Sequence, residues 1–156
     1  MGRAEDHLEL WPTGECLRHV TGVRTAEEGE LRFIPTRTHG VIDYLMGALL
    51  VVAPYLLGFA DGTAAQWVPQ LLGLVAIGGA MLTDYELGVM RVIPMPVHLM
   101  IDIGSGALLA LSPWLFGFSD RVFWPHLLVG IMEIGAGLMT RTTPEDAAGL
   151  TGGRTV

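Results

Sequence analysis

Two histidines in this chain are each followed four residues later by an aspartate. The pairs are His39 with Asp43 and His98 with Asp102. Residues four apart lie one above the other on a face of an α-helix, so each histidine can reach its own aspartate. Imidazole and carboxylate groups together support hydrogen bonding, proton transfer and coordination of a transition metal. A fifth ionisable group, Glu133, lies in another apolar stretch.

Three interpretations of these five residues stay open from the sequence. In the first, each histidine hydrogen-bonds its own aspartate or that of the other pair, and the satisfied polar groups fix the register of the helices. In the second, the acids are titratable stations on a proton or ion path. In the third, histidines and carboxylates bind a metal, or the histidines are axial ligands of a haem. No further metal-ligand motif accompanies the pairs, so the sequence does not identify a metal. We predict no cofactor.

Motifs for other functions are missing from the sequence. It has no nucleophile elbow, phosphate loop or dinucleotide fingerprint, so we expect no enzyme and assign no catalytic residue. Its single cysteine, Cys16, excludes an internal disulfide and a cysteine-based metal cluster. The formal net charge is −7 and the nine cations, all arginines, form no basic run, so nucleic acid is not an expected partner.

The elements that carry these residues are long and apolar. Hydrophobic residues make up 51% of the 156 residues and charged residues 16%, against about 25% in soluble domains. A helix needs roughly 17–25 apolar residues to cross a bilayer, and a soluble bundle would show polar helix faces. Four stretches without such faces are nearly free of charge: residues 40–60, 67–83, 97–118 and 122–140. We therefore predict an all-α, polytopic membrane protein with four transmembrane helices.

The flanks of these stretches predict their orientation. One arginine, Arg121, lies in the predicted outer loops, whereas four flank the inner ends: Arg32, Arg37, Arg91 and Arg141. By the positive-inside rule both termini are cytoplasmic. Aromatic residues that favour the headgroup layer lie near the outer ends: Tyr55, Trp67, Trp114 and Trp124. Tyr85 alone marks the inner side in this way.

The first half of the apolar region is repeated in the second. The spacing that relates His39 to His98 continues unchanged from 47–61 to 106–120, and a slightly shorter spacing then relates 67–83 to 124–140. Each copy holds two helices, so the copies run in the same direction about a pseudo-two-fold axis along the membrane normal. We divide the chain into an acidic cytoplasmic tail (1–35), a first two-helix repeat (36–89), a second (90–141) and a cytoplasmic C-terminal tail (142–156).

A proline lies inside the first helix of each repeat. Ser112, Pro113 and Trp114 are followed by Leu-Phe-Gly-Phe, and in the first copy Ala53, Pro54 and Tyr55 take the place of the tripeptide. Proline frees the carbonyl one turn earlier, and in lipid that carbonyl needs another donor, for which the Ser112 hydroxyl is suited. We favour a fixed kink, which splays the outer halves of the helices, over a hinge.

This tripeptide, in a two-helix hairpin present twice, resembles the SPW-repeat family of small bacterial and archaeal membrane proteins. The resemblance covers residues 38–140. It implies the two-hairpin architecture and a location in the bacterial or archaeal cell (inner) membrane, and it implies no catalytic activity.

Glycines recur along all four stretches, and small residues mark helix contacts in a bilayer. They are Gly47, Gly73, Gly78, Gly79, Gly104, Gly106, Gly130, Gly135 and Gly137. His126, Gly130, Glu133 and Gly137 share one helical stripe, which we expect to face protein. His126 itself, near the outer end, is expected at headgroup level.

From these features we expect an accessory, assembly or scaffold component of the membrane. Its surroundings are the lipid bilayer, and its partner is another copy of the chain or another membrane protein. The alternative is a small proton or ion transporter, or a metal- or haem-binding membrane protein, that uses the paired His-x3-Asp sites.

Overall fold

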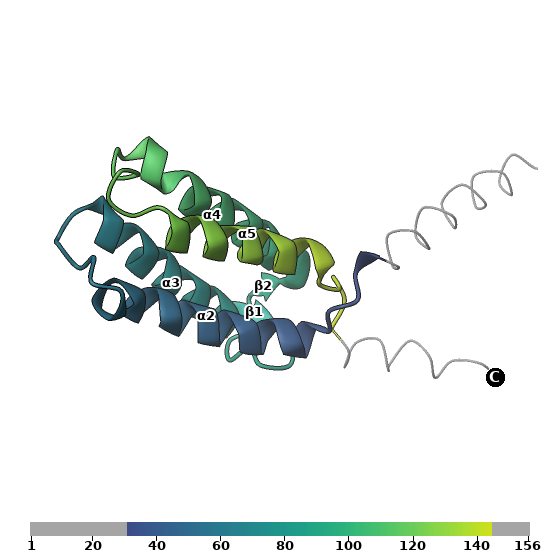
Figure 1. Ribbon diagram of the computed structural model, residues 1–156. Helices are drawn as coiled ribbons and strands as arrows, with labels where there is room; N and C mark the ends of the chain where they lie inside the picture. The colour runs from purple at the N-terminus through teal and green to yellow at the C-terminus, as the bar shows by residue number, and fades with distance from the viewer. Residues whose placement is uncertain (1–30, 145–156) are drawn as a thin grey trace, which may run out of the picture. The chain divides into compact units, whose positions relative to one another are not determined.

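The computed structural model describes residues 31–144, so most of the two predicted tails lies outside the described residues. Met1–Leu31 is a separate unit, and the description below concerns Arg32 onward. Two antiparallel helical pairs form a bundle (Figure 1). The helices are α2 (Thr36–Leu56), α3 (Ala64–Leu82), α4 (Met95–Leu115) and α5 (Trp124–Met139). Helix α2 packs against α3 and α4 against α5, while α3 also contacts α4.

The prediction of an all-α fold with four apolar helices is confirmed. Helices α2, α3 and α4 have 21, 19 and 21 residues and are long and apolar enough to cross a membrane. Helix α5 has 16 residues, or about 24 Å, and is shorter than the predicted stretch. Pro125 lies in its first turn, where proline's missing N–H is not needed, so the helix begins at Trp124.

The duplication is visible in where the helices end and in how the ends of the repeats pair. Helices α2 and α4 begin and end at equivalent positions of the two repeats, and α3 and α5 also end at equivalent positions. Strand β1 (Thr83–Asp84) pairs in parallel with β2 (Ile93–Pro94), and Thr83 lies opposite Ile93. The equivalent residues Thr140 and Ile34 form a parallel bridge. The end of each repeat is therefore tied to the beginning of the other.

Arginines and aromatic residues gather at opposite ends of the bundle. The end where α2 and α4 begin, called here the arginine end, carries Arg32, Arg37, Arg91 and Arg141. The opposite end, called here the aromatic end, carries four rings that are each 52–63% exposed: Tyr55, Trp67, Trp114 and Trp124. Rings that are half-exposed at one level suit the headgroup layer that the sequence predicts for them.

Helices α2 and α4 end earlier than predicted, because a glycine terminates each of them. After Leu56, Gly58 adopts a φ of 73°, and the Phe59 amide donates to the Pro54 carbonyl at 2.9 Å. This is a Schellman turn, which requires the left-handed conformation that glycine adopts without strain. The second repeat has the same turn, formed by Leu115, Gly117, Phe118 and Pro113. Each proline lies in the last turn of its helix, so it has no outer half of a helix to splay, and that prediction is wrong.

The carbonyl that Pro113 frees is satisfied as predicted. The Ser112 hydroxyl, which is fully buried, donates to the Leu109 carbonyl at 2.7 Å. Leu109 precedes the proline by four residues, so its carbonyl is the one that loses its helical donor. The serine of the tripeptide therefore replaces a missing backbone hydrogen bond.

His126 solves the same problem at Pro69, which lies inside α3 and leaves the Ala65 carbonyl without its helical donor. His126 Nε2 donates to that carbonyl at 3.0 Å, and its ring lies between Phe59 and Phe118, with centroids 5.4 and 5.0 Å away. The histidine is 2% exposed. It fills the core between the hairpins at the aromatic end, so its side chain faces protein, as its helical stripe predicts, while its depth in the membrane stays a prediction.

Glycines bring the helix backbones together within each hairpin. A Cβ on Gly73 would lie 2.5 Å from the Gly47 carbonyl oxygen, and one on Gly106 would lie 2.8 Å from the Gly130 oxygen. These contacts confirm the predicted role of glycine at both helix pairs. Three of the predicted glycines face open space instead, with nothing within 4 Å of an added Cβ: Gly78, Gly104 and Gly135.

Alanine at the close contacts should destabilise the fold. We expect Gly73→Ala and Gly106→Ala each to lower the free energy of unfolding by about 1–3 kcal/mol, because the helices must separate to admit a methyl group. Gly78→Ala and Gly135→Ala are the matched controls and should change it by no more than about 0.5 kcal/mol, or stabilise through helix propensity. Unfolding in mixed SDS micelles measures both. Equal losses at all four positions would contradict this role of the glycines.

Candidate functional site

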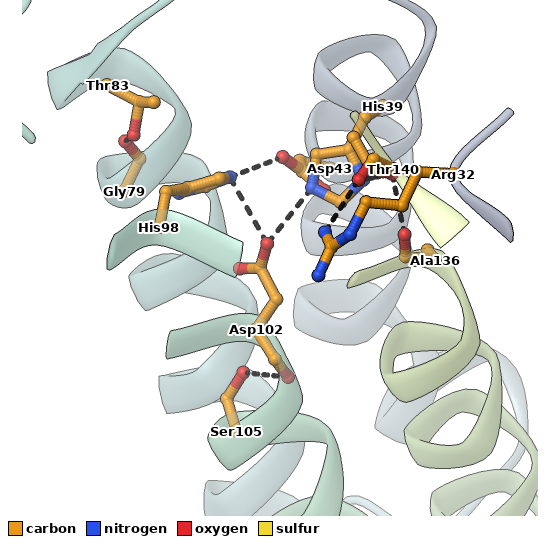
Figure 2. A network of polar contacts seen from close by, with 10 residues as sticks. All are labelled: Arg32, His39, Asp43, Gly79, Thr83, His98, Asp102, Ser105, Ala136 and Thr140. Atoms are coloured by element: carbon orange, nitrogen blue, oxygen red, sulfur yellow. Dashed lines mark hydrogen bonds and ion pairs between the residues drawn. The ribbon is translucent and has the colours of Figure 1, made fainter. Parts of the chain in front are cut away.

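The two His-x3-Asp pairs meet inside the bundle near the arginine end. Their four side chains point to a common centre (Figure 2), and one candidate ligand atom from each residue lies within 4.8 Å of the others. The two histidines are 1% exposed and the two aspartates 8%. We call His39, Asp43, His98 and Asp102 the four-residue cluster.

Within the cluster each histidine lies closest to the aspartate of the other repeat. His39 Nε2 is 3.0 Å from Asp102 Oδ2, and His98 Nε2 is 2.9 Å from Asp43 Oδ2. The distances to the aspartate on the same helix are 3.4 and 3.3 Å. The cluster therefore joins α2 to α4, one helix from each hairpin.

The second ring nitrogen of His39 has a defined partner. Its Nδ1 lies 3.0 Å from the hydroxyl oxygen of Thr140, and that hydroxyl donates its single hydrogen to the Ala136 carbonyl at 2.6 Å (Figure 2). The Thr140 oxygen must then accept a hydrogen bond from Nδ1. These two contacts of Thr140 therefore assign a hydrogen to Nδ1 of His39. In the sequence, Thr140 is the last residue of the repeated stretch 124–140 and the equivalent of Thr83. Its recurrence as a polar residue at the end of a transmembrane stretch was the available signal.

This assignment decides whether Nε2 of His39 directs a hydrogen or a lone pair toward Asp43 and Asp102. A neutral imidazole with its hydrogen on Nδ1 has only a lone pair on Nε2. That lone pair faces oxygens of Asp102 and Asp43 at 3.0 and 3.4 Å, and these oxygens are acceptors when ionised. Acceptors held this close repel each other unless a positive charge lies between them. The centre of the cluster is therefore a place for a proton or a metal cation.

The two histidines differ in their outer nitrogens. The pseudo-equivalent of Thr140 is Thr83, whose hydroxyl likewise donates to a carbonyl four residues earlier, that of Gly79, at 2.7 Å. His98 Nδ1 nevertheless has no hydrogen-bond partner among the described residues. Gly79 lies at this edge of the ring, where an added Cβ would be 3.5 Å from Nδ1, and the Tyr85 ring is stacked on the His98 ring, with the centroids 6.3 Å apart and an angle of 18°.

Tyr85 is a part of the site that sequence analysis misplaced. It is fully buried and packs against Gly40, where any side chain would collide with its ring. Burial raises the pKa of the Tyr85 phenol above its usual range, so the group stays neutral. The prediction that it marks the inner surface is wrong, because Gly40 leaves room for the ring beside the cluster.

Glu133 lies near the cluster but does not join it. It lines a cavity of about 290 Å³ together with His39, Asp43 and Asp102, and its buried Oε2 has no hydrogen-bond partner among the described residues. Apolar side chains of α2 and α5 form most of the remaining wall, among them Ile42, Met46, Met132 and Met139. Four of the five predicted residues are thus in mutual contact, and the fifth faces the same cavity.

An ion pair links the two loops at the aromatic end. Arg121 pairs with Asp61, which also accepts from the amide and the hydroxyl of Thr63 at 2.9 and 2.6 Å. The hydrogen bonds from Thr63, and then the Arg121 guanidinium, lower the pKa of Asp61 to about 2. Arg121 is the single arginine that the sequence placed on the outer side, and the structure gives it a partner from the first repeat.

Comparison with known proteins supports the repeat. The family model described as SPW repeat domain matches residues 37–140. No curated protein and no solved structure matches the chain. The matched range includes the four-residue cluster, Glu133 and both proline turns.

Valine in place of Thr140 should destabilise the fold more than valine in place of Thr83. Both threonines are fully buried and both lose the same bond to a carbonyl, but only Thr140 accepts from a histidine. We expect Thr140→Val to cost about 1–3 kcal/mol more of unfolding free energy, because the Nδ1 hydrogen of His39 is left buried without a partner. Unfolding in mixed SDS micelles measures the difference. Equal costs would refute the assigned hydrogen on Nδ1.

Proposed function

The chain belongs to the SPW repeat family, and from this premise we propose that it is a non-enzymatic accessory, assembly or scaffold component of the bacterial or archaeal cell membrane, with its termini on the cytoplasmic side. The observation that carries the proposal is that the buried histidines and aspartates bond to each other. The shortest contacts of the four-residue cluster join the two hairpins to each other.

Other polar groups in the described range also join helices, either between the hairpins or within one of them. His126 bonds a carbonyl of the first repeat, and the Gln70 side chain donates to the Val51 carbonyl at 3.0 Å between α3 and α2. Each of these bonds replaces water that a bilayer does not supply.

The outer surface favours lipid and helical partners. Large apolar side chains are exposed on all four helices, for example Leu45, Leu74, Met100 and Ile131. Gly78 and Gly104 face open space beside them, and small residues let the backbone of another helix approach. These features support a lipid environment and contact with a second copy or another membrane protein.

One observation favours the second candidate, a proton or ion transporter. Glu133 places an unpaired buried oxygen in the cavity that also reaches the cluster, and ionisable groups at such depth in a membrane often mark transport paths. The haem version has no such support. Carboxylate oxygens lie 2.9–3.4 Å from the two Nε2 atoms, where the plane of a porphyrin would have to pass.

Liposomes that contain the purified protein distinguish the two candidates. For an accessory component we expect proton and cation flux equal to that of protein-free liposomes, with no change in Glu133→Gln. Flux above that level which is lost in Glu133→Gln and retained in Asp84→Asn would establish a transporter. Asp84 is the control because its carboxylate is exposed at the arginine end, with 58% of its side chain accessible.

Labelling of the single cysteine tests the orientation. A membrane-impermeant maleimide should leave Cys16 unlabelled in intact cells and label it after permeabilisation. The control is Cys16→Ser with Asp120→Cys, which moves the thiol to an exposed residue of the aromatic-end loop and should be labelled in intact cells. The reverse pattern would place the arginine end outside.

A further inference from the structure

We propose that the four-residue cluster binds one divalent transition-metal ion, and that Zn²⁺ is its best match. The ligand atoms are Nε2 of His39 and of His98 and one carboxylate oxygen each of Asp43 and Asp102. The proposal concerns the binding site alone and holds for an accessory protein and for a transporter.

The spacing of the ligand atoms fits a tetrahedral ion. Zn²⁺ bonds to nitrogen and oxygen are about 2.0–2.1 Å long, which places neighbouring ligands about 3.3 Å apart. With Oδ2 of each aspartate as the ligand atom, three of the nitrogen-to-oxygen distances are 2.9, 3.0 and 3.3 Å. A set with one ligand atom from each residue lies within 4.8 Å of one another. Three of the separations already suit an ion at the centre, and binding would draw the more distant atoms of the set closer together.

The hydrogen on His39 Nδ1 prepares this histidine for a metal. Thr140 holds that hydrogen, so the lone pair on Nε2 points to the centre of the cluster. Histidines that bind a metal through one nitrogen almost always donate a hydrogen bond through the other, which fixes the orientation of the ring. This contact lies outside the ligand set and is independent evidence for the site.

Charge and ligand type select the class of ion. Two carboxylates and two neutral imidazoles carry a charge of −2, so a divalent ion makes the buried site neutral, as a low-dielectric surrounding requires. Calcium and magnesium prefer six or more oxygen ligands, whereas imidazole suits zinc and its neighbours in the first transition row. A closed set of four protein ligands is typical of structural zinc.

The structure also supplies a way into the site. The cavity between α2 and α5 is bounded by His39, Asp43 and Asp102, with Glu133 on its wall as a further carboxylate. His98, the fourth ligand, is stacked against Tyr85. An ion entering from the cavity would meet three of the four ligands and, once bound, would connect both hairpins.

The test measures metal bound per chain. The protein carries an affinity tag without histidine, and His7→Ala and His19→Ala in every sample remove the histidines outside the described residues. Purified protein is stripped with a chelator, loaded with Zn²⁺ and dialysed, and its metal is counted by mass spectrometry. We expect one Zn²⁺ per chain, its loss in Asp43→Asn with Asp102→Asn, and its retention in Glu133→Gln, which changes the cavity but no ligand.

Titration of the same stripped protein with Co²⁺ needs no change to the cluster. We expect the strong visible absorption of tetrahedral Co²⁺, saturating at one ion per chain and displaced by Zn²⁺. A chain that retains no zinc, a weak octahedral cobalt spectrum, or equal binding by the folded double asparagine variant would overturn the proposal and leave a proton as the cation at the centre.

Discussion

A buried polar group in a bilayer has no water to bond with, and the rest of this structure depends on that constraint. A side chain of the protein can then supply the donor that a proline removes from a helix. Pro113 frees a carbonyl and Ser112 donates to it, while Pro69 frees another and His126 donates to it from the other hairpin. Polar residues in apolar stretches are therefore used where the backbone has lost a donor, as well as where chemistry is possible.

The same constraint gives the four-residue cluster its importance. The two hairpins share small apolar cores at their ends, with Phe59 and Phe118 at the aromatic end and Tyr85 with Leu99 at the arginine end. Between these cores, ionisable groups cross from one repeat to the other, and none of them can be left uncompensated. A cation at the centre of the cluster is then part of the fold, whether it is a proton or a metal ion, because it lets the Nε2 lone pair of His39 and the carboxylates pack at hydrogen-bond distances.

Much of this arrangement was predictable from one sequence. The length of the apolar stretches predicted the helices, and the constant spacing of the repeat predicted that His39 and His98 are equivalent. Whether the two histidines face the interior of the bundle or the lipid was left for the structure to determine. Helix ends were less predictable, because Gly58 looks like another apolar residue until its φ is known. The recurrence of Thr140 marked it as a residue of interest, but the contacts of Thr140 with His39 and of Tyr85 with His98 could not be predicted, since each crosses the bundle and no local pattern encodes it.

Tandem duplication also lets the two copies differ in complementary ways. Pro69 and His126 occupy equivalent positions of the two repeats, yet one removes a backbone donor and the other supplies it. Two identical hairpins would carry either two prolines, with two carbonyls unsatisfied, or two histidines, with no freed carbonyl to receive them. Joining the copies in one chain fixes which copy has which residue. The outer nitrogens of the cluster also differ, since Nδ1 of His39 contacts Thr140 whereas Nδ1 of His98 has no hydrogen-bond partner among the described residues. The cluster is therefore asymmetric although the two hairpins are related by pseudo-symmetry.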